Sequence, residues 1–136
     1  MAPKAKSGIV LNVSVNSSRI LEIGQNDIKT EQTGKGTITG MYRGTHWDTL
    51  EVQMNPDGTS SWQVKFIHMT DKGDMLVGTG TGTGDAPNSR GIAKSKGGGT
   101  IMTQSQRLSD LNGKRWTCEV ESNLRTDKAL VKVKFE

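Results

Sequence analysis

Residues 75–84 read Met-Leu-Val-Gly-Thr-Gly-Thr-Gly-Thr-Gly, so glycine and threonine alternate after three apolar residues. Successive side chains of an extended strand point to opposite faces, which puts the four glycines on one face and the three threonines on the other. Glycine weakens a strand, and a run of glycines indicates a tight bend or the close approach of another group. We therefore predict a strand whose glycine face is turned inward, so that large side chains such as Trp62 and Trp116 press against bare backbone.

The same period of two recurs along most of the chain. Apolar residues alternate with polar ones in five further runs, at residues 9–15, 50–54, 62–66, 116–120 and 129–135. No window of eleven or more residues carries the apolar stripe of an amphipathic helix. Strict alternation is typical of strands with one buried face and one wet face. The pattern predicts an all-β protein.

Turn sequences separate these runs. Residues 55–58, 71–73 and 111–114 contain the Asn, Asp and Gly that tight hairpins favour. The expected strands are 8–15, 18–23, 27–33, 35–44, 48–55, 60–69, 74–84, 89–97, 99–107, 114–122 and 127–135. Strands of this kind joined by short turns predict a single antiparallel β-barrel of about eight or more strands in a meander, with a β-sandwich as the alternative.

Length and composition set further bounds. The chain has 136 residues, 17 glycines, one cysteine and a formal net charge of +4. We expect a flexible N-terminal tail at residues 1–7 and one barrel domain at 8–136. One cysteine excludes an internal disulfide framework and a cysteine-based zinc site. No apolar run reaches the ~18–20 residues of a membrane span or forms the core of a secretory signal, so we expect a cytoplasmic protein with no membrane partner.

The glycine-rich stretch does not fit a phosphate-binding loop. A Walker A loop requires Gly-Lys-Ser/Thr after its spacer, and neither Gly34-Lys35-Gly36 nor Gly113-Lys114-Arg115 supplies it. A dinucleotide fingerprint requires a helix to follow, whereas residues 85–88 read as a turn. We predict no cofactor.

Residues 78–91, GTGTGTGDAPNSRG, resemble the Gly-Thr-Gly strand and turn of allene oxide cyclase-like barrels and dirigent proteins. In those families an Arg-Gly pair follows the strand, as Arg90-Gly91 does here. Residues 36–40 and the hairpin around Asp57-Gly58 fit the same meander, so the resemblance covers about residues 34–97. It implies a calycin-like, eight-stranded antiparallel barrel that assembles as a dimer or trimer, and it carries over no catalytic residue.

The interior of such a barrel is the expected ligand site. By alternation His68 continues the inward face of its strand, which predicts that Trp62, Phe66, His68 and Trp116 line the interior. Tyr42 and Trp47 are expected near the rim. Apolar walls with a few polar groups are typical of small-molecule sites. The alternative role for His68 is structural, as a histidine that bonds backbone or water at a strand end.

Other reactive residues give weaker signals. His46 and Asp48 are two residues apart and would share one face of an extended segment, but we expect residues 44–48 to form a solvated loop. Two histidines without further ligands do not predict a metal site. Cys118 falls on the inward face, where a buried thiol has a raised pKa and is inert. We predict no catalytic residue.

These observations favour a small barrel that binds a small, partly apolar or amphipathic ligand or a protein partner rather than an enzyme. One alternative is an isomerase or cyclase acting in the barrel pocket. Another is nucleic-acid or polyanion binding through the basic strand faces, since Lys94 and Lys96 share one face and Lys132 and Lys134 another. A third is a structural or assembly role, with Ile67 and Met69 on an outer face making the contacts of a homo-oligomer.

Overall fold

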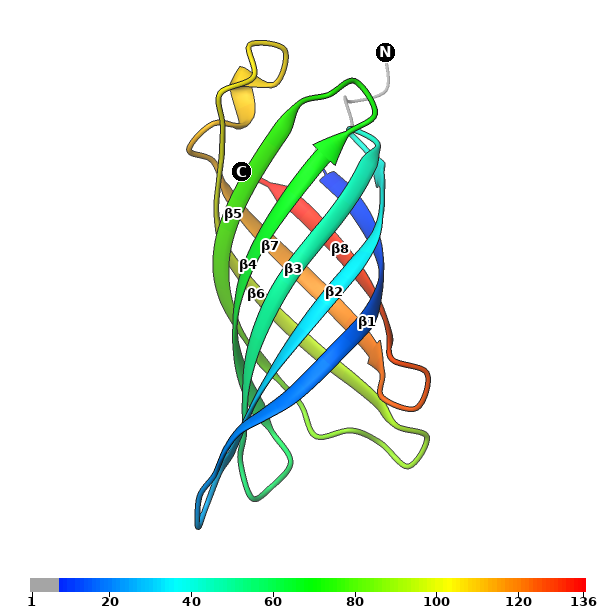
Figure 1. The fold of residues 1–136 in the computed structure, drawn as a ribbon, viewed down its shortest axis with the longest axis vertical. Helices are drawn as coiled ribbons and strands as arrows, with labels where there is room; N and C mark the ends of the chain where they lie inside the picture. Colours follow the sequence, from blue (N-terminus) through cyan, green and yellow to red (C-terminus); the bar gives the residue numbers. More distant parts are fainter. Residues whose placement is uncertain (1–7) are drawn as a thin grey trace.

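A closed antiparallel barrel forms the whole of the described chain. The computed structural model describes residues 8–136, and each strand pairs with the next while β8 returns to pair with β1 (Figure 1). The strands are β1 (Gly8–Ile23), β2 (Ile28–Gly40), β3 (Gly44–Met54), β4 (Ser60–Thr70), β5 (Met75–Gly84), β6 (Ile92–Thr103), β7 (Arg115–Asn123) and β8 (Lys128–Phe135). The prediction of an all-β, single antiparallel barrel is confirmed over the sandwich alternative. The expected tail at 1–7 lies outside the described residues.

Eight strands replace the eleven expected because three predicted breaks are absent. β1 is continuous through residues 16–17, where its register against β2 shifts between Val15 and Ser17. Such a β-bulge bends a strand without ending it. Gly34 and Gly98 likewise lie inside β2 and β6 rather than between strands. The predicted strand 35–44 is also wrong at its end, since β2 stops at Gly40 and Tyr42 lies in the turn that follows.

The glycine face of β5 is turned inward, as predicted. Gly82 lies opposite Trp62 and Gly78 opposite Phe66 in the β4–β5 register. A Cβ atom at either glycine would collide with the facing aromatic ring, and one at Gly80 would collide with the ring of Trp116. The bare wall of β5 therefore makes room for three aromatic rings inside a narrow barrel.

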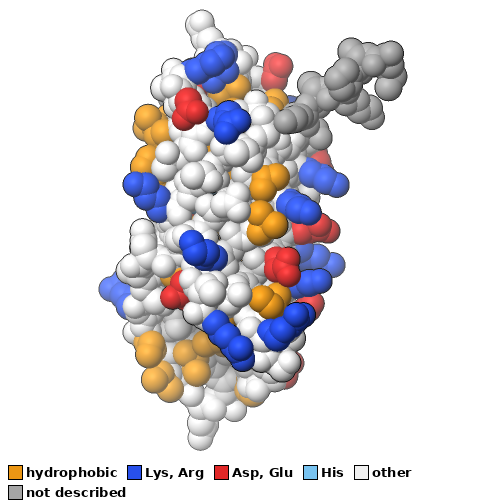
Figure 2. Space-filling view, turned by 90° about the vertical axis from the view of Figure 1, so that its right-hand side faces the viewer, with side chains coloured by type: hydrophobic (Ala, Val, Ile, Leu, Met, Phe, Trp, Pro, Cys, Tyr) orange, Lys and Arg blue, Asp and Glu red, His pale blue; other side chains and the backbone are white. Residues whose placement is uncertain are grey.

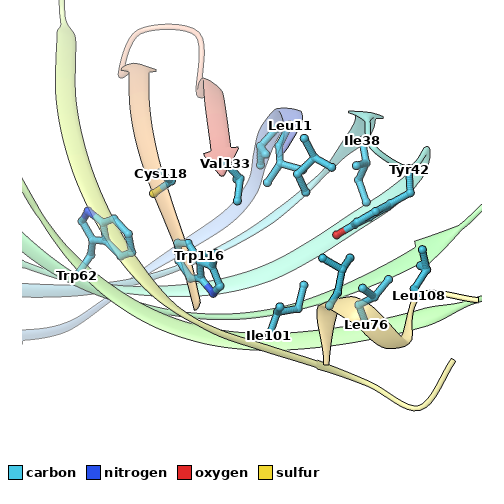
Figure 3. Close-up of a cluster of buried hydrophobic side chains, with 13 residues drawn as sticks. Leu11, Ile38, Tyr42, Trp62, Leu76, Ile101, Leu108, Trp116, Cys118 and Val133 are labelled. Atoms are coloured by element: carbon cyan, nitrogen blue, oxygen red, sulfur yellow. The ribbon is translucent and has the colours of Figure 1, made fainter. Parts of the chain in front are cut away.

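One end of the barrel is closed by the long β6–β7 connection. This segment, residues 104–114, contains the 3-10 helix η1 (Ser109–Leu111) and inserts Leu108 and Leu111, which are buried. Leu76 and the ring of Tyr42 lie beside Leu108 in the core (Figure 3). We call this the closed end; it also holds the β2–β3 and β4–β5 turns.

Asp74 fastens this segment to the β4–β5 turn. Its carboxylate accepts hydrogen bonds from the Arg107 guanidinium, from Ser105 Oγ at 2.6 Å and from Thr70 Oγ1 at 2.8 Å. These hydrogen bonds, that of Arg107 first, hold the pKa of Asp74 well below its usual range. The carboxylate therefore stays ionised at neutral pH and keeps residues 104–107 against the barrel.

The opposite end is open. Along β7, Trp116 and Cys118 are buried near the closed end, whereas Val120 and Ser122 are only half-buried. β1 shows the same gradient, from Ile9 at 2 % exposure to a half-buried Val15. Inward side chains that gain exposure along a strand face a cavity that widens toward solvent. We call this the open end.

Candidate functional site

The barrel encloses a cavity of about 140 Å³. A cavity of ~150 Å³ lined by aliphatic and aromatic side chains accepts benzene, so this space suits a ligand with one small ring. Residues of β1 to β4 and of β6 to β8 line it: Ile9, Leu11, Val13, Val15, Gln32, Thr33, Gly34, His46, Asp48, Leu50, Trp62, Val64, Phe66, His68, Ile101, Trp116, Cys118, Val120, Ser122, Ala129, Val131, Val133 and Phe135.

Four of the six predicted site residues meet around this cavity, namely Trp62, Phe66, His68 and Trp116. Their binding of a ligand stays a prediction. Tyr42 does not line the cavity; it is 4 % exposed, stacks on Phe135 and lies in the core of the closed end. Trp47 lies on the outer face of β3, 39 % exposed, with the Lys35 ammonium 5.6 Å from its ring centroid.

A chain of hydrogen bonds runs from the closed end into the cavity. Tyr42 Oη lies 2.7 Å from His68 Nδ1, and His68 Nε2 lies 2.8 Å from His46 Nδ1. His46 Nε2 in turn lies 2.5 Å from Asp48 Oδ2. We call these four side chains the relay. It joins the β2–β3 turn, β3 and β4, and it places a carboxylate at the cavity wall.

The positions of the protons in the relay follow from Tyr42. Its hydroxyl hydrogen has no acceptor among the described residues other than His68 Nδ1, so Tyr42 donates to His68. His68 must then donate from Nε2 to His46, and His46 must donate from Nε2 to Asp48. Every group is satisfied when both imidazoles are neutral and the carboxylate is ionised. The hydrogen-bond partners thus fix the tautomer of each imidazole.

Burial keeps the inner members of the relay neutral. Desolvation, and then the neighbouring His46, lower the pKa of His68 to about 2. Desolvation also raises the pKa of the Tyr42 phenol above its ordinary value. Burial disfavours the charged form of each group, so neither takes or gives a proton near neutral pH.

The expectation of a solvated loop at 44–48 is wrong. These residues begin β3, and His46 is 3 % exposed with its ring inside the barrel. Asp48, which the sequence did not identify as a site residue, is the ionisable end of the relay at the cavity. The signal was the inward alternation of Leu50 and Val52, which extends backward to Asp48 and His46.

Cys118 also faces the cavity and is 7 % exposed. Desolvation raises the pKa of its thiol to about 11. The thiol is therefore protonated at neutral pH and no basic group of the relay bonds to it. The expectation of a buried thiol is confirmed, and its lack of reactivity stays a prediction.

The predicted basic faces are interrupted by acidic side chains. β7 lies between β6 and β8, and its Glu121 is opposite Lys94 while its Glu119 is opposite both Lys96 and Lys132. On the face shown in Figure 2, basic side chains are interspersed with acidic and apolar ones. This interleaving dilutes the positive potential on which phosphate binding depends.

The outer wall carries an apolar row across β3 to β6. Trp47, Ile67, Val77 and Met102 lie opposite one another in successive registers, and Ile67 and Met102 are 43 % and 55 % exposed. Met69, expected beside Ile67 on this surface, is half-buried. A homo-oligomer through this wall stays a prediction.

The described residues, 8–136, hold no group of His, Cys, Asp and Glu side chains that could bind a metal ion. Within the same residues, no helix is both long and apolar enough to cross a membrane.

Comparison with known proteins establishes a shared fold. No family model matches the sequence, and no curated protein matches it. A conserved protein of unknown function from Rhodopseudomonas palustris is 10 % identical with a TM-score of 0.79, over 96 % of this chain and 95 % of that one. A protein of unknown function from Clostridium acetobutylicum is 12 % identical with a TM-score of 0.82, again over 96 % and 95 %.

A third solved structure belongs to an enzyme from Penicillium herquei. It is 19 % identical with a TM-score of 0.69, over 100 % of this chain and 98 % of that one. At these identities the likeness shows the antiparallel barrel fold and nothing finer. Kinship with the allene oxide cyclase-like barrels therefore stays a prediction.

Proposed function

We propose that the barrel binds a small, partly apolar molecule in its cavity. The observation that supports this most is the cavity of about 140 Å³, whose walls are aliphatic and aromatic and whose polar Asp48 lies among them. Apolar walls supply affinity and one polar group fixes orientation, which is the usual division in small-molecule sites. The open end provides the entrance.

Neutral aromatic probes test this proposal. In saturation-transfer NMR, toluene and benzyl alcohol should receive magnetisation from the protein. Both should also change the fluorescence of Trp62 and Trp116, which line the cavity. Ala129→Phe fills the cavity from β8, whereas Leu130→Phe places the same ring on the neighbouring, 37 % exposed outward position. We expect Ala129→Phe to weaken binding at least about tenfold and Leu130→Phe to change it less than about twofold, tenfold being ~1.4 kcal/mol. Equal binding by both variants would place the probes elsewhere.

An isomerase acting in the pocket is the second candidate, and the relay is the observation that favours it. A half-buried, ionised carboxylate beside apolar walls can take a proton from a carbon next to a carbonyl and return it to another carbon of the same molecule. The carbon–hydrogen electron pair stays in the substrate as a dienolate, and the returned proton completes the shift of the double bond. Asp48 would carry the proton, with His46 as a positioning residue.

Cyclohex-3-en-1-one is a suitable probe of this second candidate, because its conversion to the conjugated cyclohex-2-en-1-one is visible in the ultraviolet. Asp48→Asn should abolish any acceleration, while Leu130→Phe should preserve it. If wild type and Asp48→Asn convert the probe at the buffer rate, binding without this chemistry remains the function.

A further inference from the structure

The relay and the cavity also indicate the chemical class of the ligand. We infer that the cavity selects a molecule with an ammonium group on a small apolar, preferably aromatic body, the ammonium facing Asp48. This inference rests on the proposed function, because it concerns the same cavity.

The charges that line the cavity favour a cationic ligand. Among residues 8–136, Asp48 is the only acidic side chain that lines it, and no lysine or arginine of that range does so, in a chain with a formal net charge of +4. Every lysine and arginine of residues 8–136 is at least partly exposed. The interior of a basic protein therefore presents a single negative charge without an internal counterion.

The relay does not neutralise that charge. His46 donates to Asp48 as a neutral imidazole, because Tyr42 and His68 fix its other nitrogen as an acceptor. Protonation of His46 would reverse the hydrogen bond to His68 and leave the buried Tyr42 hydroxyl without an acceptor among the described residues. A buried hydroxyl without a hydrogen-bond acceptor destabilises the folded state, so the network favours an ionised Asp48 beside a neutral His46.

Asp48 lines the cavity, and one of its two carboxylate oxygens has no donor among residues 8–136. Oδ2 accepts from His46, whereas no group of residues 8–136 donates a hydrogen bond to Oδ1. Every fully buried side-chain oxygen or nitrogen among the described residues has a partner, so Oδ1 is open to the space beside it. The Asp48 side chain is 15 % exposed. An ammonium group placed there would donate a hydrogen bond to Oδ1 and neutralise the charge of the carboxylate.

The walls suit the same ligand. Phe66, Trp62 and Trp116 line the cavity, and Phe66 packs edge-on against Trp116 at 5.7 Å between ring centroids. Aromatic faces attract cations as well as apolar rings. Carboxylic acids are disfavoured, because a ligand carboxylate beside Asp48 would bring two like charges together with no cation to separate them.

Three matched probes test the inference on the intact protein: benzylamine, benzyl alcohol and benzoate. They share a ring and differ in the charge of the group that would face Asp48. We expect benzylamine to bind at least about tenfold more tightly than benzyl alcohol at neutral pH, and benzoate to bind more weakly than either. Asp48→Asn, which keeps the shape of the side chain, should abolish the preference for the amine and change the affinity for benzyl alcohol by less than about threefold.

The outcomes separate this inference from the proposed function. If the wild-type protein binds benzyl alcohol and benzylamine equally in a cavity that Ala129→Phe closes, the cavity binds ligands but the inference is overturned. If none of the three binds, the proposed function fails first. Because the preference is measured in the wild-type protein, a poorly folded Asp48→Asn variant leaves the test decisive.

Discussion

His46 and His68 lie directly opposite each other on β3 and β4, with 2.8 Å between His46 Nδ1 and His68 Nε2. Two imidazoles at this distance hold one proton between them, so each histidine fixes the tautomer of the other. Tyr42, at the closed end of the relay, thereby determines which nitrogen of His46 carries the proton that is donated to Asp48. The relay thus links packing of the barrel core to the chemistry of the cavity.

Removing the Tyr42 hydroxyl should destabilise the barrel and allow a second tautomer of His68. Tyr42→Phe keeps the ring that stacks on Phe135 but leaves His68 Nδ1 without its donor. We expect the free energy of unfolding to fall by about 1–3 kcal/mol, the usual cost of an unsatisfied buried group. Denaturant titration measures the loss, and ¹⁵N NMR of the imidazoles should show a second tautomer of His68. A single, unchanged tautomer in Tyr42→Phe would contradict the proton assignment.

Acid should destabilise the protein through His68. Its pKa is about 2 in the folded state and close to 6.5 when unfolded, so between these values only the unfolded chain binds the proton. Stability therefore falls as pH drops below about 6.5, by up to ~1.4 kcal/mol per pH unit from this group. Unfolding free energies measured between about pH 7 and 5, above the ordinary range of carboxyl titration, should show that slope.

The matched variant for this pH dependence is His68→Gln, which retains a donor and an acceptor but does not titrate. Its stability should depend less steeply on pH than that of the wild type over the same interval. The slope that remains in His68→Gln reports all other groups, so the difference between the two curves isolates His68. If stability depended on pH equally in both proteins, His68 would take up its proton as readily in the folded barrel as in the unfolded chain.

The bare wall of β5 should not tolerate a methyl group. A Cβ at Gly80 would overlap the Trp116 ring and approach Gly98 O at 2.7 Å. Gly80→Ala should destabilise the barrel by about 1–3 kcal/mol, the cost of overpacking. Thr81→Ala, at the next, exposed position of the same strand, should cost less than about 1 kcal/mol. Equal losses, measured by urea unfolding, would show that the glycines do not make room for the rings.

The sequence predicted the barrel and its glycine face because both depend on alternation, which is a local property. It misplaced the breaks around residues 16–17, 34 and 98 because polar residues and glycines in these positions resemble turns. In the closed barrel they form a bulge or a close approach instead, which requires the neighbouring strands to be in place.

Alternation along one strand predicts only part of the site, because the rest depends on contacts between elements. The alternation of β4 identifies His68, whereas the loop expected at residues 44–48 conceals that the alternation of β3 extends to Asp48 and His46. The free-energy cost of placing the Asp48 carboxylate inside the barrel is offset by its hydrogen bond from His46. His46 is in turn held by His68 and Tyr42, which lie on other elements. Tyr42 is buried by the segment 104–114, which no pattern near Tyr42 could have indicated.

Cys118 provides a chemical test of how well the cavity is formed in solution. Its thiol is 7 % exposed and its pKa is raised to about 11 by burial, so the reactive thiolate is scarce near about pH 8. Iodoacetamide should alkylate it at least about 100-fold more slowly in the folded protein than in denaturant, as followed by mass spectrometry. Occupying the cavity with toluene should slow the reaction further, because Cys118 lines that space. Rapid alkylation that toluene does not slow would mean that Cys118 reacts through opening of the barrel wall rather than through the cavity.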